Sequence, residues 1–432
     1  MKRTFAVLMC ALLGLAFAMP AFAAGGNYDI TNPYEDVVWE GTGKWEAYKV
    51  NLHTHTTFSD GTDDLKSMAE EYYRQGYDAV ANTDHGVVSK PWDQKPRTVF
   101  PLNVASIGKP NDILSSARLA EMNGGVGGNR SGRKMIQVPR GIELNAATVY
   151  KNHVVGLYTD WGYSWFGLST DYRTPIAGVQ RCGGVSFIAH PGDWIKSEHN
   201  PAAAKDPANV HFFADILKDY PSCLGIEVYN GSDGVTRQDR VLWDQLLMRL
   251  IPEGRQVWGL AVDDSHNVGD VGRTATIHFM PANTEENIRA SLESGALLAC
   301  SRRDRVHPLD IQADKSNPFP SVTKIEVAGE TITLTPTDTA LVEWIADGEV
   351  IATGNSIDLR TYADEITCYV RAQLIGPGGI AATQAFGVDK GDGYRHPDDA
   401  PKGWDRFVWY LNMYLTKNVF GWLIENIVKL FN

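Results

Sequence analysis

Two histidines separated by one residue follow a short apolar run near the start of the chain. His53 and His55 come directly after residues 48–52, a run whose composition predicts a β-strand. Because alternate residues of a strand point to the same side, we expect the two imidazoles to lie next to each other. Asp60 stands five residues after His55, and His85 closes the next apolar run. Imidazole and carboxylate together suit zinc, iron or manganese, so this pattern predicts a metal site.

Residues of the same types recur later in the chain, nearly all of them at an end of an apolar run rich in β-forming residues. Glu143 and His153 flank two such runs, His190 ends another, and Asp264 and His266 follow a fourth. The candidate metal ligands are His53, His55, Asp60, His85, Glu143, His153, His190, Asp264 and His266. A lone His-x-His would carry little weight as evidence for a metal site. Because matching residues recur at the ends of similar apolar runs, we expect all nine to converge on one site.

The first 23 residues have the three parts of a secretory signal peptide. Lys2 and Arg3 form a charged start, residues 4–18 are apolar but too short to span a bilayer, and Ala21-Phe22-Ala23 is a small-x-small cleavage site. The sequence therefore predicts an exported protein, periplasmic or secreted. Losing the two cations would change the formal charge from −12 to −14. Such acidity disfavours nonspecific binding to nucleic acid, which we do not expect as a partner.

Four cysteines would remain after cleavage, and the chain contains no Cys-x-x-Cys motif. A thiolate zinc site is therefore not expected. Cys182 and Cys223 both precede apolar runs that are consecutive in the chain, so a disulfide between them is a candidate pairing in an exported protein. Free buried thiols are the alternative.

Apolar runs alternate with helix-like stretches over most of the chain. The runs are residues 48–52, 77–82, 135–144, 153–158, 184–190, 224–229 and 257–262. Strands that alternate with helices predict parallel βα units. Seven such strands, with ligands at their carboxyl ends, predict an α/β fold with a seven-stranded barrel over residues 24–318 whose loops build the site at one face.

The composition changes after residue 318. A Pro-containing linker there leads into residues 319–390, which alternate apolar and polar residues and predict a small β-sandwich-like module. Residues 391–432 predict a linker and an amphipathic helix. That helix lacks the uninterrupted apolar length of a membrane span, so it either lies on a membrane surface or docks on the body or on a partner subunit.

Two long loops near the candidate ligands each allow two interpretations. The glycine-rich stretch 86–134 is either a lid over the substrate or a surface insertion. Residues 158–172 carry Trp161, Tyr163, Trp165 and Phe166, which either wall a pocket or pack over the rim of the barrel.

The motifs resemble those of the PHP (polymerase and histidinol phosphatase) superfamily, and they occur in that family's order over about residues 46 to 300. The matching segments are His53-x-His55, Ser59-Asp60-Gly61, Thr83-Asp84-His85, Gly141-Ile142-Glu143, His153, Ala189-His190-Pro191, Gly225-Ile226-Glu227-Val228-Tyr229-Asn230 and Asp264-x-His266. The resemblance implies a distorted seven-stranded barrel that holds two or three divalent metals. The predicted export and the added β module are most similar to the carbaryl-hydrolase-type branch.

By the same resemblance, all nine candidate ligands bind the metal cluster, and Glu143 bridges two metals. The expected catalytic residues are Glu143, His190 and Asp264. Asp84 and Glu227 are expected to support the ligands from behind, with Asp84 fixing His53 or the adjoining loop. Asp263 is a weaker ligand candidate.

The leading functional hypothesis is a metal-dependent hydrolase, with phosphoester hydrolysis by a metal-activated hydroxide as its reaction. No Gly-x-Ser-x-Gly motif is present, which argues against a serine esterase. Arg273, Arg302 and Arg303 are candidates to bind the phosphate of a small-molecule substrate, or else surface or structural arginines. Two alternatives stay open: a carboxylic or carbamic ester hydrolase that uses the same metals, and a non-enzymatic metal-binding protein.

Overall fold

The computed structural model describes residues 28–98, 107–128, 130–145, 151–165, 167 and 170–416. The predicted signal peptide lies outside the described residues, as do Phe166 and residues 417–432 of the predicted C-terminal helix.

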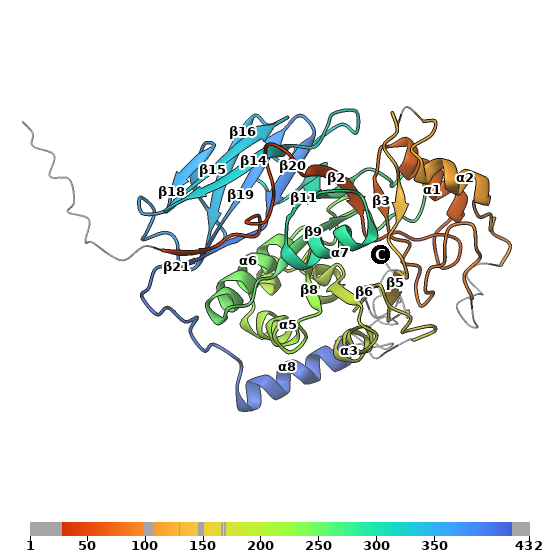
Figure 1. Cartoon of the computed structure of the whole chain (residues 1–432). Helices are drawn as coiled ribbons and strands as arrows, with labels where there is room; N and C mark the ends of the chain where they lie inside the picture. The colour runs from red at the N-terminus through yellow and green to blue at the C-terminus, as the bar shows by residue number, and fades with distance from the viewer. Residues whose placement is uncertain are drawn as a thin grey trace, which may run out of the picture.

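The described chain is a mixed α/β protein (Figure 1). Its helices are α1 Leu65–Arg74, α2 Ser116–Asn123, α3 Arg173–Arg181, α4 Pro191–Ile195, α5 Pro207–Asp219, α6 Asp239–Leu250, α7 Glu285–Ser294 and α8 Gly403–Thr416. The strands before residue 302 are β1 Asp29–Thr31, β2 Glu46–Asn51, β3 Ala79–Val80, β4 Ile136–Gln137, β5 Ile142–Leu144, β6 Val154–Leu157, β7 Val185–Ile188, β8 Cys223–Asn230, β9 Trp258–Val262, β10 Thr274–Met280 and β11 Leu297–Ser301. The later strands are β12 Arg303–Asp304, β13 Ile311–Gln312, β14 Ser321–Ala328, β15 Thr331–Thr337, β16 Leu341–Ala346, β17 Glu349–Thr353, β18 Ser356–Asp358, β19 Tyr369–Gly376, β20 Gly379–Thr383 and β21 Phe386–Asp389.

Each of the seven apolar runs contains a strand, but the strands belong to two sheets. β2, β3 and β4 pair in parallel in one sheet, and β5 to β9 form the other in chain order. Two isolated bridges connect the sheets, between Thr54 and Ser265 and between His85 and Glu143. Each bridge includes or adjoins a candidate ligand, so the two sheets meet at the predicted site.

The all-parallel arrangement that we predicted is wrong for β6. This strand pairs antiparallel with both β5 and β7, whereas β7, β8 and β9 are parallel. Only residues 145–153 connect β5 to β6. A parallel pair needs a crossover of about a dozen residues or more, usually a helix, so this connection allows only an antiparallel return.

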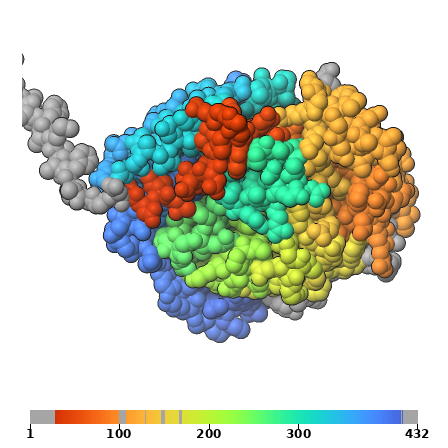
Figure 2. Space-filling model, viewed as in Figure 1, coloured from red at the N-terminus to blue at the C-terminus, as the bar shows by residue number. Residues whose placement is uncertain are grey.

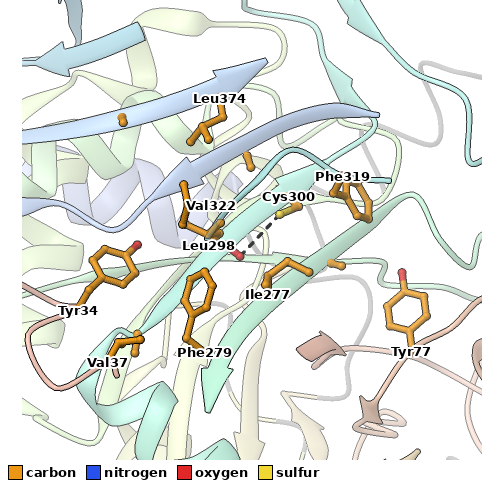
Figure 3. Close-up of a cluster of buried hydrophobic side chains, with 14 of the residues drawn as sticks. Tyr34, Val37, Tyr77, Ile277, Phe279, Leu298, Cys300, Phe319, Val322 and Leu374 are labelled. Atoms are coloured by element: carbon orange, nitrogen blue, oxygen red, sulfur yellow. Dashed lines mark hydrogen bonds between the residues drawn. The ribbon is translucent and has the colours of Figure 1, made fainter. Parts of the chain in front are cut away.

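The strands after residue 318 continue the sheet that contains β2. β20 pairs antiparallel with β11, and β19 pairs with β20, while β14, β15 and β18 form a separate three-stranded sheet. One hydrophobic core joins these strands to the earlier ones, as Val322 and Leu374 pack in the same cluster as Phe279 and Leu298 (Figure 3). The C-terminal strands therefore share a sheet and a core with the strands that carry the candidate ligands.

The helix α8 docks on the body, which agrees with one of the two interpretations of the tail. The ring of Trp409 lies 5.4 Å from the ring of Phe212 in α5, and its indole N–H donates to Asn209 Oδ1 at 3.2 Å. Met413 is buried in the same contact. Within the described part of the chain, no helix is long and apolar enough to cross a membrane.

Deleting residues 403–432 is expected to change the turnover of a soluble substrate by no more than about twofold, because none of residues 403–416, the described part of this segment, lines the pocket that holds the candidate ligands. The melting temperature should fall, because Phe212 and its neighbours lose their cover. Steady-state kinetics and a thermal melt check both points. Loss of turnover in a truncated protein that keeps its far-ultraviolet circular dichroism spectrum would refute the expectation.

Candidate metal centre

All nine candidate ligands come together between the two sheets. Eight of them line one pocket: His55, Asp60, His85, Glu143, His153, His190, Asp264 and His266. His53 lies fully buried beside it, with Nε2 3.2 Å from Glu143 Oε2. His153 precedes β6 rather than ending a strand. Because β6 is antiparallel to its neighbours, its start lies on the same side as their carboxyl ends, so His153 still faces the site.

Glu143 occupies the centre of the group. One carboxylate oxygen, Oε1, lies 3.0 Å from His153 Nδ1 and 3.1 Å from His190 Nε2. The other, Oε2, lies 3.1 Å from His55 Nε2 and 3.1 Å from His85 Nδ1. Each oxygen of a single carboxylate thus faces a different set of imidazoles, which is the arrangement that a bridging ligand needs.

A second carboxylate, Asp60, faces the outer imidazoles. Its Oδ2 lies 3.4 Å from His266 Nε2 and 3.6 Å from His85 Nε2, and its Oδ1 lies 3.5 Å from His55 Nδ1. Asp264 Oδ1 lies 3.1 Å from His55 Nε2. His55 therefore stands between Asp60 and Asp264, as His85 stands between Asp60 and Glu143.

The donor atoms fit divalent cations in number, type and spacing. Three groups have donor atoms within 4.8 Å of one another: His55, Asp60, His85 and His266; His53, His55 and Glu143; and His85, Glu143 and His153. Glu143 Oε2, Asp264 Oδ1 and His85 Nδ1 are buried without a hydrogen-bond partner. Two ligands of one ion, each about 2.1 Å from it, lie about 3.0–3.4 Å apart, close to the distances found here.

Glu227 orients two of the candidate ligands from behind, as expected. It is fully buried, and its Oε1 lies 2.7 Å from His53 Nδ1. Its Oε2 accepts hydrogen bonds from the backbone N–H of His190 at 2.8 Å and from Asn230 Nδ2 at 2.9 Å. The contact fixes the His53 ring with Nε2 toward Glu143, and a carboxylate in this position makes the imidazole a stronger ligand.

Asp84 supports the loop after β2 rather than His53. It accepts hydrogen bonds from Thr56 N at 2.8 Å, Thr56 Oγ1 at 2.9 Å and Ser59 Oγ at 2.7 Å. Ser59 Oγ in turn lies 3.3 Å from His55 Nδ1. Asp84 thus holds the loop that presents His55 and Asp60, one of the two roles that we had expected.

Two candidate ligands have backbone conformations in the left-handed region. The φ angle is 29° at His190 and 44° at Asp264. Both positions are fixed by hydrogen bonds, from His190 N to Glu227 and from Asp264 N to His53 O at 3.1 Å. Positive φ is uncommon for residues other than glycine, although aspartate and histidine adopt it more readily than most, and such conformations cluster at functional sites.

The charges of the cluster are strongly coupled. Although burial disfavours a charged imidazole, the carboxylates of Asp264, Glu143 and Glu227 hold the pKa of His53 well above its ordinary value. His55 behaves in the same way. For His85, burial prevails and lowers the pKa to about 3. Despite burial, the surrounding histidines hold the pKa of Glu143 well below its ordinary value, so this carboxylate stays ionised.

Metal retention is expected to fall as the pH is lowered from 8 to 5. Protons and metals compete for the same imidazole nitrogens, and the raised pKa values of His53 and His55 mean that protonation begins above the ordinary midpoint of about 6.5. The metal content after dialysis at each pH, with circular dichroism to verify folding, measures the effect. Constant metal content across this range would contradict it.

The pocket also contains residues that the sequence analysis missed. Lys151, Asp193, Asn230 and Val235 complete its lining. Lys151 Nζ lies 3.4 Å from Asp193 Oδ2 and is half-exposed, and Asn230 Nδ2 donates to Asp264 Oδ2 at 3.1 Å. In the sequence, Lys151 stands two residues before the candidate ligand His153, and this position could have indicated that its side chain lies at the site.

The three arginines proposed for phosphate binding do not line this pocket. Arg302 stacks on the ring of Phe319 at 3.7 Å and donates to Gly378 O. Arg303 pairs with Asp310 at 2.9 Å. These contacts favour the alternative of structural arginines for both residues, because their guanidinium groups bind other parts of the fold.

Arg273 pairs with Asp270 at 2.7 Å, outside the pocket lining. Asp263 is not part of the cluster either, since it accepts hydrogen bonds from Gly272 N, Thr274 N and the Tyr77 hydroxyl. The Arg273–Asp270 pair and the hydrogen bonds of Asp263 stabilise the segment that follows β9.

The disulfide prediction is wrong, because Cys182 and Cys223 are both free. Cys182 is exposed at the end of α3, whereas Cys223 is buried at the start of β8. Burial raises the pKa of the Cys223 thiol to about 12, so it remains protonated.

The loops near the site pack on the body in their described parts. Trp165 donates to Asn145 Oδ1 at 2.9 Å, Tyr163 donates to Val88 O at 3.3 Å, and the rings of Trp161 and Trp165 lie 5.3 Å apart. No described residue of the stretches 86–134 and 158–172 lines the pocket. These contacts favour rim packing for the aromatic loop. In the glycine-rich stretch, Lys109 Nζ donates to Asp60 O at 3.3 Å and to Gly61 O at 2.9 Å, so this stretch contacts the loop that presents Asp60.

No protein-family model matches this chain, and no curated protein matches it either. Among solved structures, it is similar to a two-domain protein of Bacteroides vulgatus that contains a predicted PHP-like metal-dependent phosphoesterase, with 17% identity, a TM-score of 0.42, and coverage of 81% of this chain and 89% of that chain. A protein of Bifidobacterium adolescentis assigned as a metal-dependent phosphoesterase has 15% identity and a TM-score of 0.28, covering 51% of this chain and 88% of that chain.

A lesion-specific endonuclease of Pyrococcus furiosus has 12% identity and a TM-score of 0.34, with coverage of 82% of this chain and 74% of that chain.

Proposed function

We propose that this protein is an exported metal-dependent hydrolase that acts on phosphate esters of small molecules. The observation that carries the proposal is the position of Glu143, whose two oxygens each face a separate set of imidazoles at 3.0–3.2 Å. The finer features belong to the same proposal: a distorted seven-stranded PHP barrel, nine metal ligands, and two or three ions of manganese, zinc or iron.

Divalent cations bound in such a cluster would activate a water molecule for attack and stabilise the negative charge that develops on the ester. The residues of the chain provide the frame for this reaction. Glu143 and Asp264 supply ionised oxygens, since burial fails to neutralise either of them next to the histidines. Glu227 keeps the His53 ring in one orientation. No side chain is required to act as the nucleophile.

With divalent cations bound, the pocket would favour an anionic substrate group, because the cations would outweigh the four carboxylates of its lining. Its volume is about 100 Å³ and Val235 is the one apolar side chain in its lining, which suits a polar group better than a large apolar one. Lys151 lines the pocket and can contact an anionic oxygen through its half-exposed ammonium group. A neutral carboxylic or carbamic ester would leave this cation without a function in binding.

A substrate panel with metal-supplemented enzyme tests the proposal. We expect release of nitrophenol from p-nitrophenyl phosphate or bis(p-nitrophenyl) phosphate, loss of this activity with a chelator, and recovery with added metal. We also expect Lys151→Met to raise the KM for these substrates more than it lowers kcat. Hydrolysis of p-nitrophenyl acetate or an aryl carbamate alone would support the carbon-ester class instead. Full metal loading without any hydrolysis would support a non-enzymatic metal-binding protein.

Export is tested separately from the reaction. The charged start, apolar stretch and cleavage motif of residues 1–23 support it. We expect N-terminal sequencing of the mature protein to begin near Ala24. A mature protein that still begins at Met1 would rule out cleavage.

A further inference from the structure

The helix α8 has apolar side chains on two opposite faces. One face docks on α5 through Trp409 and Met413, and the latter is 8% exposed. The other face carries Trp404, Phe407, Leu411 and Leu415, which are three or four residues apart and therefore share one side of the helix. An amphipathic surface helix would carry polar residues there.

This outer face is exposed. Trp404, Phe407, Tyr410, Leu411 and Leu415 are between 42% and 72% exposed. The rings of Trp404 and Phe407 lie 5.2 Å apart, so they form one apolar surface. The helix lies at the edge of the molecule, at the bottom of the view (Figure 1), where it forms part of the outer surface (Figure 2). We call this the outer face of α8.

We propose that the outer face of α8 binds the interfacial region of an anionic lipid bilayer, with the helix parallel to the membrane surface. Tryptophan and tyrosine favour this region, because each has an apolar ring and a polar group. The exposed residues therefore match a helix that lies in a membrane surface rather than one that spans it.

The C-terminal segment is less acidic than the rest of the chain. Residues 391–432 contain five cations and five carboxylates, whereas the whole chain carries −12, so this segment repels an anionic surface less than the remainder does. Within it, Lys402 pairs with Asp398 at 2.7 Å. Attraction to anionic lipids adds to the burial of apolar area in such helices.

A second copy of the chain fits this face less well. A stable protein interface buries about 800 Å² on each partner. The five exposed side chains can supply roughly 500 Å², since a large aromatic side chain presents about 150–250 Å² when it is fully exposed. A bilayer requires no matching area or shape, so a single convex helix is sufficient.

Vesicle co-sedimentation of the full chain tests the proposal. Vesicles of phosphatidylcholine alone and of phosphatidylcholine with one quarter phosphatidylglycerol are compared. We expect binding to the anionic vesicles, and at least about a tenfold weaker association for the triple variant Trp404→Gln, Phe407→Gln, Leu411→Gln. The matched control replaces three exposed apolar residues elsewhere, Ile107→Gln, Val126→Gln and Leu309→Gln, which are 56% to 76% exposed. This control should bind like the unchanged protein.

Three results would overturn the proposal. The first is equal sedimentation of the unchanged protein with and without vesicles. The second is a dimer in light scattering that the triple variant loses, without any vesicle binding, which would assign the face to a second copy. If circular dichroism shows that the triple variant is misfolded, the double variant Phe407→Gln, Leu415→Gln provides the same comparison. Unchanged vesicle binding in a folded variant of either kind also refutes it.

Discussion

Replacing Glu143 by glutamine is expected to lower metal-dependent hydrolysis by more than about 100-fold, since even the groups that only support metal ligands contribute about 10–100-fold. Both oxygens of this carboxylate face imidazole nitrogens, with Oε1 near His153 and His190 and Oε2 near His55 and His85. An amide would turn an N–H₂ group toward one of the two sets and could bind metal through only one atom. The metal content should fall together with the rate.

The matched control for this substitution is Glu349→Gln, which makes the same chemical change at an exposed position in β17. Plasma mass spectrometry measures the metal content, and circular dichroism verifies that both variants are folded. A folded Glu143→Gln protein with full metal content and unchanged turnover would show that Glu143 does not bridge metals.

Replacing Glu227 by glutamine is expected to weaken metal binding by about 10–100-fold while the protein remains folded. Glu227 Oε2 accepts hydrogen bonds from both His190 N and Asn230 Nδ2. If the amide nitrogen of glutamine replaced Oε2, its N–H₂ group would face two other donors, His190 N and Asn230 Nδ2. If the amide were flipped, the same N–H₂ group would face His53 Nδ1. Either orientation disturbs a ligand without removing one.

Metal affinity measured by competition with a chromogenic chelator tests this second substitution, with Glu349→Gln again as the control. The affinity is expected to fall more than the melting temperature of the metal-free protein. An unchanged affinity would mean that the contact between Glu227 and His53 has no part in holding metal.

The sequence pattern anticipated the gathering of the candidate ligands, because they follow short apolar runs that are local in the chain. His53 and His55 illustrate this, since they follow β2 with one residue between them and their Nε2 atoms lie 3.1 Å apart. Glu227 was found only because it lies in a recognisable motif, and its contact with His53 spans 174 residues of sequence. Nothing local in either segment specifies that pairing.

The features that could not be predicted depend on long-range strand pairing. The continuation of the sheet into β19 and β20 is one of them, because it follows from pairing with β11. The contact between Arg302 and Phe319 could not be predicted for the same reason, because it forms only when the chain is folded. The sequence also offers no sign that Cys182 is exposed while Cys223 is buried. The direction of β6 is different, since the short connection of residues 145–153 is local in the sequence and already indicates an antiparallel return.

The central claim is that these ligands hold one cluster of metals around Glu143. Anomalous diffraction from crystals of the metal-loaded protein, collected at the absorption edge of the bound metal, tests it most directly. We predict two or three peaks between the two sheets, with donor atoms of Glu143 and the histidines about 2.0–2.3 Å from them. Crystals of fully loaded protein with no peak near Glu143, or with peaks only at surface carboxylates, would contradict the claim.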